Sequence, residues 1–174
     1  AIPKIGTAVR DYSEMARRID AYTGGIGLSA HARTCFDETG GLKPFVSFNG
    51  KSLARNQTKM FDIIEELLFK YSFSDLSRLK SLLLDFSAGL ESAVIQNGHR
   101  LAISVASRKF SPVSALSEIW GGIHQLKSIK SITDNLSAGN LESISDDLCA
   151  IAKKLFTRDN LKIAWIGENS DLAK

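Results

Sequence analysis

The sequence predicts an α+β fold, in which a small antiparallel sheet is covered by several helices. One early segment alternates apolar and polar residues with a period of two, which is typical of a half-buried strand. Most later segments repeat apolar residues every three to four positions, as amphipathic helices do. Strands followed by a run of helices favour a two-layer α+β arrangement.

The composition is that of a globular domain. Of the 174 residues, 44% are hydrophobic and 24% are charged, so the chain can bury a core and is not disordered. This length allows one domain, or one domain with a short extension. The net charge of +3 is too small to indicate a nucleic-acid partner. No apolar run approaches the roughly 18 residues of a transmembrane helix, so no membrane partner is expected.

The first element is a short helix over residues 12–22, where apolar residues recur at helical spacing. Either Asp11 or Ser13 can cap its N-terminus. The Gly24-Gly25 pair then ends it, because glycine is common just beyond the last turn of a helix.

Two strands come next, over residues 26–34 and 44–49. Residues 37–41 (Asp-Glu-Thr-Gly-Gly) form a turn between them, so the strands are expected to pair as a hairpin. Side chains two positions apart lie on the same face of a strand. The first strand therefore has one polar face, made of Ser29, His31 and Arg33.

Apolar stripes predict helices over most of the remaining chain. The first begins at Asn56 or Thr58 and runs to about residue 71, and the second covers residues 75–96. Asn97-Gly98 breaks the pattern. Residues 99–109 alternate β-branched side chains and fit either a helix or a strand, and we favour a helix.

The last helices have clearer starts. Ser111 is an N-cap serine with Pro112 at the first helical position, and the stripe from there continues to about residue 132. Ser143 and Asp146 resemble a capping box for a further helix. Residues 161–166 alternate again and predict a final strand. Three strands make a poor sheet, which suggests that neighbouring strands belong to a longer chain.

The histidines do not form a metal-binding motif. No pair has the spacing of H-E-x-x-H or H-x-x-E-H. His31 and Cys35 are four positions apart on a strand, which separates their Cα atoms by roughly 13 Å. We therefore expect no metal site within this chain.

The carboxylates give no convincing catalytic pair. Glu118 and His124 lie six positions apart on one predicted helix and should point to different faces. Glu65 and Glu66 lie opposite the apolar stripe of their helix and are expected to face water. Asp37 and Glu38 belong to the predicted turn and are also expected to be solvated.

The two cysteines, Cys35 and Cys149, are expected to be buried free thiols, because two cysteines do not make a disulfide framework. Free thiols favour a reducing compartment, either the bacterial cytoplasm or an organelle matrix. The start of the chain lacks both an initiator Met and a signal peptide, so we expect a piece of a longer polypeptide.

Four segments, taken in order and at their spacings, carry a family resemblance. They are Tyr22–Ile26, Lys51–Met60, Asn97–Arg100 and the Ser111-Pro112 helix start. Together they resemble the pitrilysin/insulinase-type zinc metallopeptidases, and most closely the presequence-protease branch, which includes falcilysin-like enzymes. The resemblance covers about residues 4–135 and continues weakly into the strand expected at residues 161–166.

The resemblance implies a processing-peptidase-like two-layer domain within a four-domain enzyme. Such enzymes close around a chamber in which unfolded or targeting peptides are cut. Their zinc site lies on the first domain, where an inverted H-x-x-E-H helix and a distant Glu hold the metal. Residues 1–135 look like the third, non-catalytic domain without its N-terminal strand and helix. Residues 136–174 look like a connecting helix and the first strand leading to the next domain.

The resemblance therefore implies no catalytic or metal-ligating residue here, and zinc only in the parent enzyme. The expected partners are the other domains of the same polypeptide, a peptide substrate, and possible self-association through an exposed sheet edge. From its alternating polar face, we expect the first strand to line the chamber through Ser29, His31 and Arg33. The alternatives are an inert structural subunit of the same fold and an unrelated helical interaction module.

Overall fold

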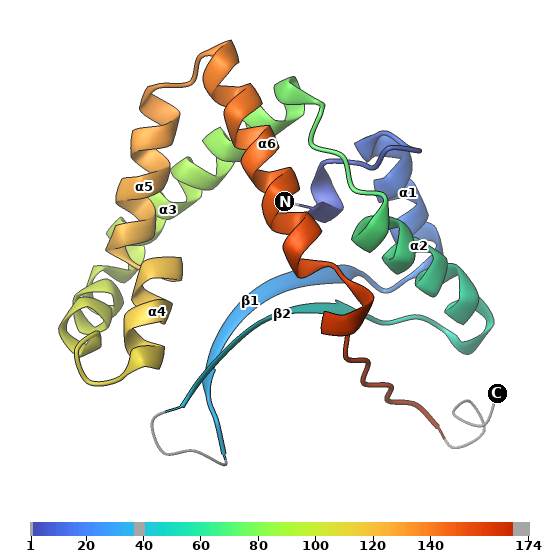
Figure 1. Ribbon diagram of the computed structural model, residues 1–174, viewed down its shortest axis with the longest axis horizontal. Helices are drawn as coiled ribbons and strands as arrows, with labels where there is room; N and C mark the ends of the chain where they lie inside the picture. Colours follow the sequence, from blue (N-terminus) through green and yellow to red (C-terminus); the bar gives the residue numbers. More distant parts are fainter. Residues whose placement is uncertain (1, 37–40, 169–174) are drawn as a thin grey trace. The chain divides into compact units, whose positions relative to one another are not determined.

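A computed structural model describes residues 2–36 and 41–168 (Figure 1). The described chain is mainly helical and contains a single two-stranded sheet, which confirms the α+β class. It divides into two compact units. The first comprises Ala1–Gly27, Phe48–Asp75 and Ser143–Lys174, and the second comprises Leu28–Ser47 and Leu76–Glu142.

The first unit contains helices α1 (Tyr12–Tyr22) and α2 (Gln57–Phe69) and most of α6 (Ala138–Leu155). The side chain of Asp11 caps α1 by accepting a hydrogen bond from the Glu14 N–H at 2.8 Å, as expected for one of its two candidate caps. The helices enclose an apolar core. Its buried members are Ile5, Met15, Ile19, Met60, Ile63, Leu67, Leu68, Phe73 and Ala152.

The segment before α1 is held against the end of α2 by backbone hydrogen bonds. The Ala8 N–H donates to the Lys70 carbonyl at 2.8 Å, and Thr7 forms an isolated antiparallel bridge with Tyr71. Short 3-10 turns precede α1 and α2, at Ile2–Lys4 and Ala54–Asn56. These contacts fix the N-terminal segment on the first unit.

Strands β1 (Ile26–Thr34) and β2 (Leu42–Gly50) form the sheet and run side by side in Figure 1. The Cys35 N–H donates to the Gly41 carbonyl at 3.0 Å, just beyond the ends of both strands. This bond fixes an antiparallel register in which the two nine-residue strands pair without a bulge. Of the predicted turn, residues 37–40 lie outside the described residues, including Asp37 and Glu38.

The second unit contains α3 (Leu76–Ser107), α4 (Pro112–Gly121) and α5 (Ile123–Asp134), which pack on one another. The predicted break at Asn97 is present as a single non-helical residue (φ −131°, ψ 30°), and α3 continues as a helix on both sides of it. Ser111 caps α4 as expected, by accepting a hydrogen bond from the Ser114 N–H at 3.1 Å.

Two predicted helix limits were wrong. The expected continuous helix over residues 112–132 is two helices, because Gly122 adopts an extended conformation between them (φ −105°, ψ −157°). Helix α6 begins at Ala138 rather than at Ser143, so the predicted capping box lies inside the helix. Gly139 did not stop α6, which shows that packing can outweigh the low helix propensity of glycine.

The strand expected over residues 161–166 is absent from the structure. After a 3-10 turn at Arg158–Asn160, residues 161–168 have no regular secondary structure. A strand requires a hydrogen-bonded neighbour, and within the described residues the sheet consists of β1 and β2 alone. Instead, Trp165 stacks on Phe61 of α2, with ring centroids 4.8 Å apart.

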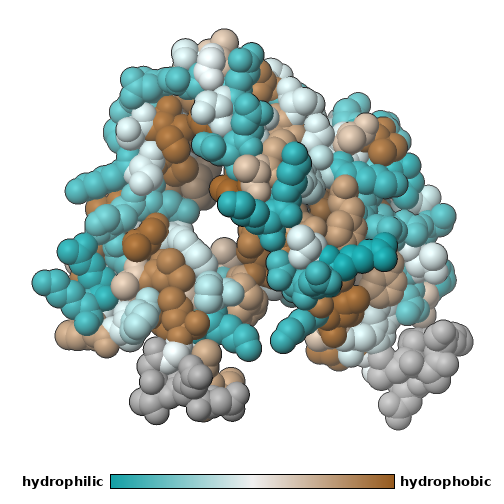
Figure 2. All heavy atoms as spheres, viewed as in Figure 1, coloured by the Kyte–Doolittle hydropathy of each residue, from teal (hydrophilic) through white to brown (hydrophobic). Residues whose placement is uncertain are grey.

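The second unit buries little of its apolar surface. Of the stripe predicted along α3, Leu79 is buried, whereas Phe86 is 43% exposed, and Ile95 on the same helix is 88% exposed. Figure 2 shows hydrophobic side chains at the surface over α4 and α5. Within the described residues, no helix combines the length and apolarity needed to cross a membrane.

Candidate functional site

The three residues expected to line a chamber occupy one face of β1. Ser29 and Arg33 are exposed and His31 is half-buried. Because side chains alternate along a strand, the three point to the same side of the sheet. The structure thus gives a hydroxyl, an imidazole and a guanidinium in a row, spaced by two residues each.

The imidazole of His31 is held in place by two residues of β2. Its Nε2 atom lies 3.0 Å from the Ser47 hydroxyl oxygen, within hydrogen-bond distance. Its ring packs on Phe45, with centroids 5.0 Å apart and planes tilted by 31°. Counting back four residues on each strand from the Cys35–Gly41 pair brings His31 directly opposite Phe45, so these are cross-strand contacts. They orient the ring while leaving it partly open to solvent.

Strand β2 extends this face with residues that the sequence analysis did not select. In the same register Lys43 lies opposite Arg33 and Ser47 lies opposite Ser29. Neither strand contains an acidic residue, so the face is basic. The signal was present in the sequence, because Lys43, Phe45 and Ser47 are also two positions apart.

The residues of this chain do not fit a zinc ion. Among residues 2–36 and 41–168 there is no group of three or more His, Cys, Asp or Glu side chains that could hold a metal. Cys35 and Cys149 are both free thiols and are half-buried rather than buried. His31 is engaged with Ser47 and Phe45.

One buried carboxylate lies in the first unit. Glu66 is buried, and the hydroxyl of Thr7 donates to its Oε1 atom at 2.7 Å. The guanidinium of Arg10 binds its Oε2 atom and also reaches Glu14 at 3.2 Å. The expectation that Glu66 faces water was therefore wrong, because the segment before α1 folds over it and supplies a cation and a hydroxyl. Glu65, its neighbour, is exposed as expected.

The second buried carboxylate belongs to Glu118, whose side chain is 1% exposed. Its Oε2 atom contacts Nδ1 of His124, and its Oε1 atom accepts a hydrogen bond from the His124 N–H at 3.4 Å. Nη1 of Arg108 lies 3.3 Å from the other ring nitrogen of His124. The expectation that Glu118 and His124 point apart was wrong, because it assumed one unbroken helix.

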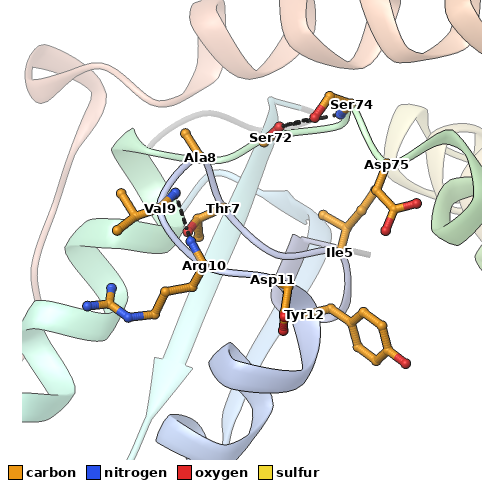
Figure 3. Close-up of a pocket in the computed structure, with 10 residues that line it drawn as sticks. All are labelled: Ile5, Thr7, Ala8, Val9, Arg10, Asp11, Tyr12, Ser72, Ser74 and Asp75. Atoms are coloured by element: carbon orange, nitrogen blue, oxygen red, sulfur yellow. Dashed lines mark hydrogen bonds between the residues drawn. The ribbon is translucent and has the colours of Figure 1, made fainter.

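An open pocket of about 300 Å³ lies beside the segment that precedes α1 (Figure 3). Its polar groups are used in local hydrogen bonds. The Thr7 hydroxyl oxygen accepts from the N–H groups of Val9 and Arg10, and the hydroxyls of Ser72 and Ser74 lie 2.8 Å apart. In Figure 3, Arg10 points away from Tyr12. This pocket is a product of local turn structure, and the basic face of the hairpin is the stronger candidate site.

The sequence of residues 1–132 matches the family model described as the region associated with peptidases of subfamily 16C. Because the match covers most of the chain, the chain belongs to this peptidase-associated family. This agrees with the presequence-protease-like resemblance found from the four sequence segments.

Similar proteins come from animals, fungi and bacteria. The mitochondrial presequence protease of Danio rerio is 28% identical over 94% of this chain and 16% of its own length. That of Yarrowia lipolytica is 25% identical over 95% of this chain and 17% of its own length. "Protein HypA" of Clostridium perfringens is 23% identical over 97% and 17%. The chain thus spans about one sixth of the length of these relatives.

Proposed function

We propose that this chain is a non-catalytic part of a presequence-protease-type zinc metallopeptidase, in which it shapes a closed chamber where unfolded or targeting peptides are cut. The family match over residues 1–132 is the observation that supports this proposal most directly. The zinc ion that activates water in such an enzyme belongs to another domain of the parent protein. Described residues of this chain offer no cluster that fits it.

The proposed domain limit lies near residue 135. Residues 1–135 form the non-catalytic domain, and residues 136–174 lead toward the next one. The end of α5 at Asp134 and the start of α6 at Ala138 support this limit. So does the end of the family match at residue 132. The other domains of the same polypeptide are the proposed partners.

Within the chamber, Ser29, His31 and Arg33 are the proposed peptide-facing residues. An unfolded peptide exposes backbone N–H and C=O groups, and a row of hydroxyl, imidazole and guanidinium groups can hydrogen-bond to them. Arg33 can also bind a peptide carboxylate through two parallel hydrogen bonds. These contacts hold substrate without taking part in bond cleavage.

The test uses the full-length parent enzyme with Ser29, His31 and Arg33 all replaced by Ala. Loss of two or three hydrogen bonds, each contributing about 1 kcal/mol, should raise KM for peptide cleavage by about tenfold or more. The kcat should change little, because these contacts bind substrate and transition state alike. Ala30→Ser, Ala32→Ser and Thr34→Ala on the opposite face form the matched control, for which KM should stay unchanged. Unchanged turnover in the triple Ala variant would sink the proposal.

The proposed compartment is a reducing one, either the bacterial cytoplasm or an organelle matrix. The free thiols of Cys35 and Cys149 support it. Several relatives are named as mitochondrial proteins, and another is bacterial. Localisation of the tagged parent protein by fractionation checks this assignment.

A further inference from the structure

The register of the hairpin decides which backbone groups face outward. Cys35 and Gly41 form a hydrogen-bonded pair, and such pairs recur at every second residue along an antiparallel ladder. Odd-numbered residues of β1 therefore bond to β2. The N–H and C=O groups of the even-numbered residues point to the outer edge. In β1 these are Ile26, Leu28, Ala30, Ala32 and Thr34.

The two outer edges are not equivalent. In β2 the outward position at the centre of the edge is occupied by Pro44, which has no N–H group. Proline on an outward position of a strand marks an edge that does not pair further. The outer edge of β1 has no proline, and in the part of the chain that the structure describes no further strand lies beside it. Of the two strands, β1 is the one that presents a complete row of donors and acceptors.

The charges along the hairpin restrict what can pair with this edge. One face carries His31, Arg33 and Lys43, and neither strand has an acidic side chain. The opposite face of β1 carries apolar and small side chains, among them Leu28, Ala30 and Ala32. A strand added beside β1 places alternate side chains on these two faces. Acidic residues on the first face and aliphatic residues on the second are complementary to β1.

We infer that the outer edge of β1 is an acceptor for an extended peptide in which aliphatic and acidic residues alternate. The peptide adds a third strand to the sheet, with main-chain hydrogen bonds to the even-numbered residues of β1. A two-stranded sheet is marginally stable by itself, so a third strand also stabilises the hairpin. The inference stands on register, Pro44 and charge, and it does not depend on the proposed peptidase function.

A second copy of the chain fits this edge less well than an acidic peptide. Pairing of two β1 strands would place the Arg33 and His31 side chains of both copies on neighbouring strands of one sheet, without a carboxylate between them. Like charges on adjacent strands destabilise pairing. Self-association through this edge is therefore the competing outcome in the test.

The experiment titrates the isotope-labelled 174-residue chain with the capped peptide Val-Glu-Val-Asp-Val-Glu-Val and follows backbone amide exchange by NMR. We expect exchange at Leu28, Ala30 and Ala32 to slow by about tenfold or more at saturation, as expected when backbone hydrogen bonds form. Exchange at Val46 and Phe48 on the β2 edge should not change. A peptide with Lys at the acidic positions should not bind.

Two proline variants separate the edges while sparing the ladder between the strands. Ala32→Pro removes an outward donor from β1 and should weaken binding by about tenfold or more, whereas Val46→Pro on the β2 edge should leave it within about twofold. Arg33→Glu, at an exposed position, should shift the preference toward the Lys peptide and does not rely on a backbone change. The NMR spectrum of each variant reports whether it is folded.

Four results would overturn the inference. These are absence of binding, equal protection of both edges, full binding by the Ala32→Pro variant, and protection of the β1 edge that depends on protein concentration alone. The last result would assign the edge to a second copy of the chain.

Discussion

Glu118 and His124 form a buried hydrogen-bonded pair across the break between α4 and α5. The break exists because Gly122 is extended, and this turns the N-terminus of α5 back toward the Glu118 carboxylate. The same carboxylate accepts a hydrogen bond from the His124 N–H, one of the donors that have no partner within the first turn of a helix. Its negative charge also lies at the positive end of the α5 dipole.

Gly122→Ala should destabilise the chain, because the new Cβ atom would lie 2.6 Å from both the backbone carbonyl and the carboxylate of Glu118. Overpacking of this kind costs about 1–3 kcal/mol in the free energy of unfolding. Gly121→Ala is the matched control, because its Cβ meets nothing within 4 Å. It should be neutral or stabilising by about 0.5–1 kcal/mol, since Ala is the better helix former. Urea unfolding followed by circular dichroism measures both, and equal effects would contradict the account of the break.

Glu66→Ala should cost about 3–5 kcal/mol in the free energy of unfolding, because it leaves the partly buried guanidinium of Arg10 and the Thr7 hydroxyl without their shared partner. Glu65→Ala, one position earlier on the exposed side of α2, should change stability by less than about 0.5 kcal/mol. The two variants remove the same functional group from adjacent residues. Similar losses of stability would show that Glu66 contributes only as a surface charge.

The pKa of the Tyr71 phenol is raised above 10.0, first by burial and second by the negative charge of Cys149. Its ring packs between Phe73 and Phe156, with centroids 5.7 Å and 6.0 Å away. In a variant that combines Tyr12→Phe and Tyr22→Phe, Tyr71 is the remaining tyrosine. Its ultraviolet absorbance should therefore report a titration midpoint above pH 10.0. Cys149→Ser should lower that midpoint without bringing it fully to the ordinary value, because burial remains.

The raised pKa of Tyr71 also sets a direction for stability. The folded chain favours the neutral phenol, so this contribution is complete below pH 10.0 and is lost as the pH rises through the folded-state pKa. Unfolding by urea at several alkaline pH values should show a steeper loss of stability in the parent than in a Tyr71→Phe variant. The same pH dependence in both chains would contradict the assignment.

The elements that the sequence predicted correctly depend on local interactions. Asp11 and Ser111 cap helices because their side chains reach N–H groups three residues ahead, which requires no distant partner. Strand β1 has its predicted limits because the period-two alternation distinguishes it from a helix. The polar face of Ser29, His31 and Arg33 follows from that alternation alone.

The errors lie where distant segments meet. Glu66 appeared solvated on its own helix, and only the fold of the segment containing Thr7 and Arg10 buries it. Residues 161–166 have the alternation of a strand, but alternation gives no hydrogen-bonded neighbour.

The sequence by itself determined the class of fold, most of the helices, the hairpin and the peptidase family. Tertiary structure decided which carboxylates are buried, that His31 contacts Ser47 and Phe45, and that Pro44 lies on the outer edge of the sheet. The physical reason is the range of the interactions. Helix caps and side-chain periodicity act within a few residues, whereas burial, ion pairing and strand register depend on atoms that the chain brings together only when it folds.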